Sequence, residues 1–151
     1  MPLTADLVFQ AANLCAVAGW LALALALGVI LKNALLRDRI AGWVWPTLLA
    51  IAYVAIMGAL MTGAIAAPEG GDFSSLAGVM AFFASPWAAT VGWIHYLAFD
   101  LFVGVRITQD AERDGVARRW LIPILPLTFL LGPAGLLAFN VVRVGVGRKA
   151  G

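Results

Sequence analysis

One apolar stretch of this sequence carries three side chains that could transfer protons. It contains His95, Tyr96 and Asp100, and His95 is the only histidine in the chain. At about 100° per residue of α-helix, Tyr96 lies about 100° and Asp100 about 140° from His95, so all three share one sector of a helix. A carboxylate in membrane hydrocarbon costs at least ~2.5 kcal/mol, which contact with lipid does not offset. We therefore expect this sector to face the interior of a helical bundle.

Two roles are open for Asp100. It is either an architectural partner that accepts hydrogen bonds from Tyr96 or from another helix, or a proton donor or acceptor in acid/base chemistry. His95 alone would be interpreted as a structural histidine. Because Asp100 and Tyr96 lie on the same face, a structural and a catalytic role are both open for it. The sequence does not assign which of the two would be the acid and which the base.

The first apolar stretch carries a polar stripe made of Asp6, Gln10 and Asn13. Spacings of four and seven residues bring these side chains within about 40° of one another on a helix. We expect the stripe to hold helices together through interhelical hydrogen bonds, and the alternative is that it lines the polar end of a cavity.

A proline interrupts the last apolar stretch at Gly132-Pro133. Pro133 removes a backbone hydrogen bond and frees the carbonyl of Phe129, so a kink in one continuous helix is expected. Because a freed carbonyl in a membrane needs a partner, the kink is either a matter of geometry or a notch for a ligand.

The composition indicates which elements position these residues. Of 151 residues, 63% are hydrophobic and 12% are charged, and the mean hydropathy is +0.96, all outside the range of soluble globular proteins. About 20 apolar residues of helix cross a bilayer. The sequence therefore predicts an all-α polytopic membrane protein, a single domain over residues 1–151, built as a four-helix transmembrane bundle with spans at about 6–31, 43–66, 87–107 and 120–144.

A further apolar segment, at about 73–84, is too short to cross. It is predicted to be an interfacial or re-entrant helix, which is either a loop packed on the bundle or a lid over a lateral opening. Ser85-Pro86 after it is typical of an N-cap followed by proline at the first helical position.

Basic residues predict the orientation. The connections after the first and third spans carry Lys32, Arg37, Arg39, Arg106, Arg113, Arg118 and Arg119. With four spans, the opposite side has only Arg143, Arg148 and Lys149. The positive-inside rule then favours both termini outside the cytoplasm, although the basic C-terminal tail opposes this.

Several classes of function are disfavoured by what the sequence lacks. One histidine cannot supply a His-rich metal site within one chain, so no metal and no cofactor are predicted. The lone Cys15 excludes a disulfide framework, and its expected role is packing. Basic residues flank apolar runs, so no nucleic-acid partner is expected, while membrane lipid and a homo-oligomer are.

Two strings of the sequence carry a resemblance to a known family. One is His95-Tyr96-Leu97-Ala98-Phe99-Asp100-Leu101-Phe102, within a similar stretch from Phe73 to Gly104, and the other runs from Thr128 to Leu137. Both resemble the abscisic-acid-deficient-four-like family of membrane proteins. Together with the hydropathy pattern, the similarity covers most of the chain.

The resemblance implies a role in carotenoid chemistry. Plant members of the family are linked to the formation of neoxanthin from violaxanthin, so the implied partner is a carotenoid or related isoprenoid and the implied activity is a carotenoid epoxide isomerase. An acid would protonate the epoxide oxygen while a base removes the proton from the adjacent polyene carbon, without net redox change. His95 and Asp100 match the family string and are the implied pair, with Tyr96 as hydrogen-bond donor.

A groove lined by aromatic side chains would suit so long a ligand, although aromatic residues in spans more often pack or contact lipid. The expected lining residues are Phe82, Phe83, Trp87, Trp93, Phe99, Phe102 and Phe129. The chain starts without an organelle-targeting segment, so we expect an integral protein of a bacterial inner membrane whose substrate need not be violaxanthin.

Two other functions compete with the isomerase. The first alternative is a non-catalytic carotenoid-binding, lipid-binding or assembly protein, in which Asp100 only satisfies neighbouring donors. The second is a small proton-coupled transporter that dimerises, in which Asp100 exchanges a proton for substrate. No clear inverted repeat favours the transporter, although a homodimer does not need one.

Overall fold

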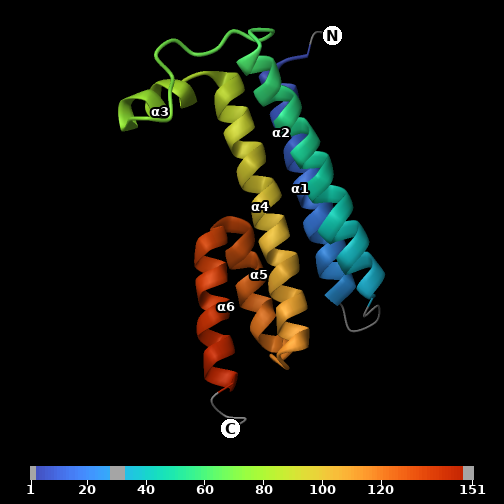
Figure 1. Ribbon diagram of the computed structural model, residues 1–151. Helices are drawn as coiled ribbons and strands as arrows, with labels where there is room; N and C mark the ends of the chain where they lie inside the picture. The colour runs from blue at the N-terminus through green and yellow to red at the C-terminus, as the bar shows by residue number, and fades with distance from the viewer. Residues whose placement is uncertain (1–2, 28–32, 148–151) are drawn as a thin grey trace. The chain divides into compact units, whose positions relative to one another are not determined.

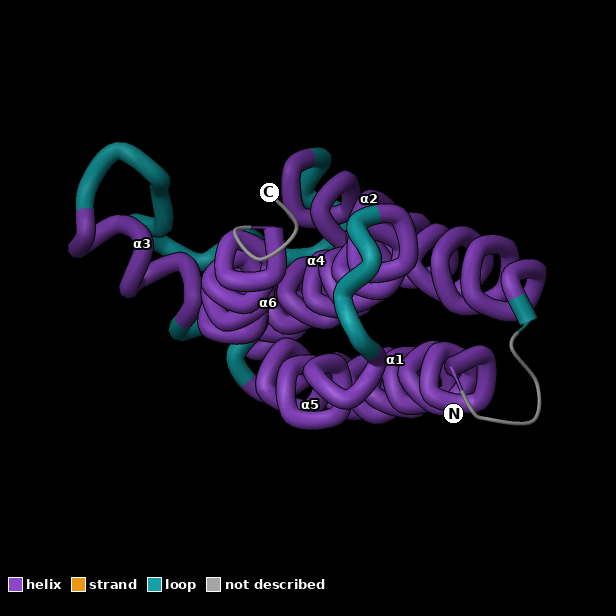
Figure 2. Tube along the Cα trace, turned by 90° about the horizontal axis from the view of Figure 1, so that it is seen from below, coloured by secondary structure: helices purple, strands orange, loops and turns teal. Residues whose placement is uncertain are grey.

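The computed structural model describes residues 3–27 and 33–147, and within these ranges it contains helices and loops but no strands (Figures 1 and 2). The predicted all-α class is confirmed. The elements in chain order are α1 (Ala5–Leu27), η1 (Leu36–Val44), α2 (Trp45–Met61), α3 (Leu76–Phe83), α4 (Pro86–Arg113), η2 (Arg118–Trp120), α5 (Leu121–Leu130) and α6 (Gly132–Gly147).

Three helices are long and apolar enough to cross a membrane. They are Ala5–Leu27, the continuous run Leu36–Met61 formed by η1 and α2, and Pro86–Arg113. These three helices overlap the first three predicted spans, whose last residues in the first case (28–31) lie outside the described residues. The second begins at Leu36 and not near residue 43, because a π-helical segment continues directly into α2. Helix α4 begins at Pro86, where the Ser85-Pro86 pair predicted it.

The predicted fourth span is not one helix. Helices α5 and α6 have 10 and 16 residues, about 15 and 24 Å of helix, whereas a bilayer core is about 30 Å thick. They separate at Leu131, which has φ −146° and ψ 70°. Pro133 has no N–H to donate to the carbonyl of Phe129, and its ring would clash with that carbonyl in a regular helix, which favours a kink or a break at this point. The expected kink is a break.

After the break the chain turns back, and α5 and α6 lie side by side as a helical hairpin (Figure 1). Their backbones approach closely because Gly135 has no side chain. A Cβ at Gly135 would lie 2.6 Å from Cα of Thr128. Thr128 is fully buried, and its hydroxyl donates to the carbonyl of Ile124 at 2.8 Å. Small and polar residues at such contacts are typical of helix pairs in membranes.

The chain divides into two compact units. The first unit is Met1–Val17 with Thr47–Ala98, and the second is Ala18–Pro46 with Phe99–Gly151. The core of the first unit is made by Ala12, Ala16, Leu49, Ile56, Leu60, Phe82, Ala88, Val91, Ile94, Leu97 and Ala98. The second unit has two clusters, whose largest buried members are Leu23, Ile107, Leu121, Ile124 and Phe139.

Helix α3 and the loop before it belong to the first unit. Ser75 caps α3 by accepting from the N–H of Gly78 at 3.0 Å. The Asp72 carboxylate accepts from the hydroxyl and the N–H of Ser74, and the hydroxyl holds the pKa of this carboxyl below its ordinary value. Leu76 and Met80 are exposed on α3. The segment predicted at 73–84 is thus helical, and its interfacial or re-entrant placement stays a prediction.

In the second unit, ion pairs connect the end of α6 to the end of α4. Asp110 contacts Arg113 at 3.0 Å, Arg106 at 3.3 Å and Arg143 of α6 at 3.8 Å. Arg143 also contacts Asp114, and Arg113 and Arg143 together lower the pKa of the Asp114 carboxyl. The hairpin therefore returns to the end of the third span, from which it began.

Charge is segregated between the two units. The sequence of the first unit contains Asp6, Glu69 and Asp72 but no lysine or arginine. All ten lysines and arginines belong to the sequence of the second unit. Those among the described residues lie in η1, toward the end of α4, in η2 and toward the end of α6. Three crossings followed by a hairpin would put the described ones on the same side of the membrane.

This arrangement predicts a different orientation from the four-span bundle. Three crossings put the termini on opposite sides, and the positive-inside rule then puts the C-terminus in the cytoplasm and the N-terminus outside. Green fluorescent protein fused to the C-terminus should fluoresce, and alkaline phosphatase fused there should be inactive. Alkaline phosphatase inserted between Gly70 and Gly71 should be active. An active C-terminal phosphatase would indicate four crossings.

Candidate functional site

Asp100 is buried on α4, with 6% of its surface exposed. Its carboxylate lies against Gly132, the first residue of α6. A Cβ built at Gly132 would lie 2.7 Å from Cγ and 3.2 Å from Oδ2 of Asp100, closer than real side chains approach one another. The one carboxylate expected in mid-span is therefore at the break between α5 and α6.

His95 is exposed on α4 and lies beside the ring of Tyr53 from α2, in the first unit. The ring centroids are 5.5 Å apart, with 54° between the planes. Tyr53 is one of only two tyrosines in the chain, and sequence reasoning missed it. The signal was a phenol within an apolar span, but nothing in the sequence pairs it with His95.

Tyr96 belongs to an aromatic and polar contact network that joins α4 to α1. Its ring stacks on Trp93 at 5.2 Å, and Nε1 of Trp93 donates to Oδ1 of Asn13 at 3.1 Å. The side chain of Asn13 donates in turn to the carbonyl of Phe9 at 2.8 Å. Of the predicted polar stripe, Asn13 thus makes the expected interhelical hydrogen bond.

The other two members of the stripe, Asp6 and Gln10, are exposed on α1. The helical sector expected to face the interior also divides by exposure: Asp100 is buried, Tyr96 is half-buried and His95 is exposed. The reason is the position of His95 around the axis of α4. The fully buried residues Val91, Ile94 and Leu101 lie on a neighbouring face of this helix, and His95 lies outside that face.

The aromatic residues expected to line a groove occupy several environments. Phe82 is buried and contacts Phe83 edge to face at 5.4 Å. In the second unit, Phe129 contacts Trp20 at 5.5 Å. Trp87 packs against the core of the first unit, Trp93 belongs to the network above, and Phe99 and Phe102 are exposed.

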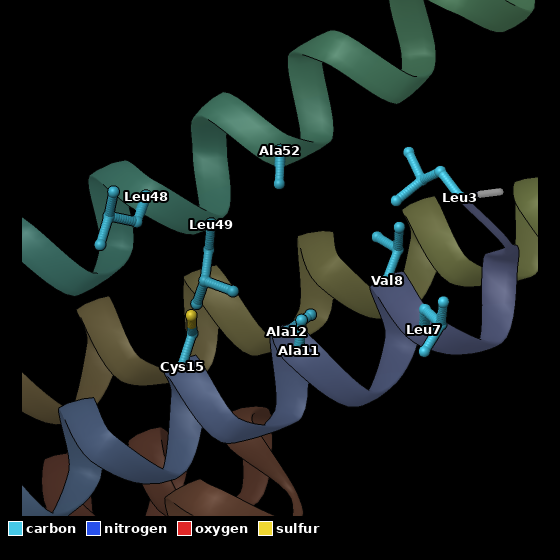
Figure 3. A pocket seen from close by; sticks show the side chains of 9 residues that line it. All are labelled: Leu3, Leu7, Val8, Ala11, Ala12, Cys15, Leu48, Leu49 and Ala52. Carbon is cyan, nitrogen blue, oxygen red and sulfur yellow. The ribbon is translucent and has the colours of Figure 1, made fainter. Parts of the chain in front are cut away.

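A cavity of about 350 Å³ lies elsewhere, between α1 and α2 in the first unit. Figure 3 shows Leu48, Leu49 and Ala52 of α2 facing the helix that carries Ala12 and Cys15. The complete lining is Leu3, Leu7, Val8, Ala11, Ala12, Cys15, Leu48, Leu49 and Ala52. Sequence reasoning missed this apolar groove because aliphatic and small residues carry no chemical signal.

The apolar groove could hold part of a hydrocarbon chain, since its volume is at the lower end of the range for ligand sites. The described residues include no group of three or more His, Cys, Asp or Glu that could hold a metal ion. The first unit contains the exposed imidazole of His95, the phenols of Tyr53 and Tyr96, and the apolar groove. The second unit contains the buried carboxylate of Asp100.

A family model described as ABA4-like, ABA DEFICIENT 4-like, matches residues 7–139. These residues run from the first turns of α1 into α6 and include His95, Tyr96, Asp100 and Gly132. No curated protein and no solved structure matches the chain.

The Asn13–Trp93 hydrogen bond generates a stability prediction. Trp93→Phe keeps an aromatic ring but removes the N–H donor, and such interhelical bonds contribute about 0.6 kcal/mol in membrane proteins. We expect Tm to fall by about 1–2.5 °C in a fluorescence-detected thermal assay in mild detergent. Trp43→Phe, at a tryptophan that is 64% exposed, is the control and should leave Tm unchanged. Equal shifts would mean that the hydrogen bond does not stabilise the helix pair.

Proposed function

The chain belongs to the ABA4-like family, and we propose that it modifies a carotenoid or related isoprenoid within the membrane. Membership in the family implies a role related to carotenoid and neoxanthin biosynthesis. The proposed reaction is the isomerisation of an epoxycarotenoid-like substrate by acid/base catalysis.

The observation that carries the proposal is the burial of Asp100. A carboxylate in a membrane-spanning helix reduces the stability of the inserted protein, and ionisable groups at such positions usually serve a function. Asp100 is 6% exposed within α4, and it lies inside the range that matches the family. The other carboxylates of the chain lie toward the ends of helices or in loops.

The reaction needs two proton-transfer groups and no redox partner. A base removes the proton from the polyene carbon next to the epoxide, the electrons of that C–H bond form a new double bond, and the epoxide C–O bond breaks. An acid gives its proton to the released oxygen. The product is an allenic alcohol with the same atomic composition as the substrate. We assign the pair to His95 and Asp100, five residues apart on α4, and the hydrogen-bond donor to Tyr96.

Access for the substrate follows from its solubility. A carotenoid dissolves in the hydrocarbon of the bilayer and would approach the protein through surfaces that face lipid. His95 is exposed on α4, and the groove between α1 and α2 is apolar. Tyr53, in contact with the imidazole, would hold the ring of His95 in place.

A second candidate function is carotenoid or lipid binding without catalysis. The observation in its favour is the apolar groove, whose lining side chains are all aliphatic except for the thiol of Cys15. In that case Asp100 would have only an architectural role at the break between α5 and α6.

The experiment is co-expression of the chain with a defined epoxycarotenoid, followed by chromatography of the extracted pigment. We expect conversion to an isomer of the same mass, with Asp100→Asn and His95→Gln each lowering it at least ~100-fold. Asp6→Asn replaces an exposed carboxylate on α1 and is the control that should retain activity.

The outcomes separate the two functions. Unchanged pigment with folded wild-type protein would reject the isomerase. Pigment that co-purifies equally with wild type and Asp100→Asn, without conversion, would support binding alone.

A further inference from the structure

The glycines of α6 differ sharply in what surrounds them. A Cβ at Gly145 would have no atom within 4 Å. A Cβ at Gly135 would meet Thr128 of α5, and a Cβ at Gly132 would meet the carboxylate of Asp100. All of these residues belong to the second unit. The absence of a side chain at Gly132 is therefore what lets a charged group reach the start of a helix.

The start of α6 is suited to a negative charge. A helix N-terminus carries about half a positive charge, because the peptide dipoles of the helix add along its axis. The first backbone bonds of α6 run from Ala134 and Gly135 to the carbonyl of Leu131, at 2.8 and 3.2 Å. Because Asp100 is buried, salt screens this interaction much less than it would at the surface.

We propose that Gly132 is a positioning residue for Asp100, and that the N-terminus of α6 stabilises this side chain as a carboxylate. This inference rests on the proposed function and deepens it, because a general base must be deprotonated before it acts. Asp100 is then the base that accepts the proton from the polyene carbon. The epoxide oxygen takes its proton from the acid, and the protein returns to its starting state once Asp100 has lost a proton and the acid has gained one.

The hairpin acquires a role in this arrangement. A fourth span that continued through residue 131 would bring no helix N-terminus to Asp100. The break at Leu131 creates one, and Pro133 favours a break there because it cannot donate to the carbonyl of Phe129. The feature that shortens α5 and α6 below the thickness of a bilayer therefore also supplies the compensating charge.

The test uses dicyclohexylcarbodiimide, a hydrophobic reagent that adds to protonated carboxyl groups in membranes. Wild-type protein in liposomes is treated with it, and modification at Asp100 is followed by peptide mass spectrometry, with Asp100→Asn defining the background. We expect slow modification in wild type and about tenfold faster modification in Gly132→Ala, since a methyl group displaces the carboxylate from the helix N-terminus.

Two glycines of the same helix provide matched controls. Gly145→Ala enters open space and should label as slowly as wild type. Gly135→Ala disturbs the contact of α5 and α6 without touching Asp100, and it should also label slowly. Fast labelling in Gly135→Ala would mean that loosening of the hairpin is sufficient, and it would overturn the assignment to Gly132. Unchanged labelling in folded Gly132→Ala would overturn it as well.

A second variant approaches the same contact from the other side. Asp100→Glu adds a methylene that pushes the carboxylate into Gly132, so labelling at position 100 should also rise. This variant decides the question if Gly132→Ala does not accumulate, and slow labelling of Asp100→Glu would then contradict the proposal.

An activity measurement separates this inference from the proposed function. Gly132→Ala should lower epoxycarotenoid conversion at least ~10-fold. Asp100→Asn should lower conversion by a smaller factor in the Gly132→Ala background than in wild type, because the effects of two residues that act together are not additive. If wild-type protein converts no pigment, the isomerase fails while the labelling experiment still decides whether Gly132 positions Asp100. If conversion occurs and labelling is unchanged, the inference alone fails.

Discussion

A negative charge in membrane hydrocarbon has to be compensated from within the protein, since lipid tails offer neither ions nor hydrogen-bond donors. In the second unit the path of the chain meets this requirement. The chain stops at Leu131, starts a new helix at Gly132, and so brings the positive end of a helix to the buried carboxylate of Asp100. Close packing of Thr128 on Gly135 then holds the two short helices together.

Much of the fold could be predicted from hydropathy and helix punctuation. Three long apolar runs became three helices able to cross a membrane, and Ser85-Pro86 marked the start of α4 correctly. The fourth apolar run was predicted wrongly as one span. Hydropathy reports that residues prefer lipid or a protein core to water, and it carries no information on whether the chain reverses direction. Gly132-Pro133 was identified as a disruption, but a kink and a reversal have the same local sequence signal.

The candidate site was less predictable because its contacts join distant parts of the sequence. Helical periodicity sufficed to expect burial for Asp100, whereas it gave the wrong environment for His95, which is exposed beside the buried face of α4. The neighbours of these residues, Tyr53 and Gly132, are 42 and 32 residues away from them along the chain. No spacing rule connects such pairs. The groove between α1 and α2 had no signal at all, since its residues differ from ordinary packing residues only in their arrangement.

The segregation of charge described above limits how copies of the chain can assemble. Some small membrane proteins insert in either direction because their basic residues are balanced between the two sides, and such chains can form antiparallel dimers. Here all ten lysines and arginines are in one unit and none is in the other, an imbalance that permits a single direction of insertion. A homo-oligomer of such a chain would therefore consist of parallel subunits, related by an axis along the membrane normal.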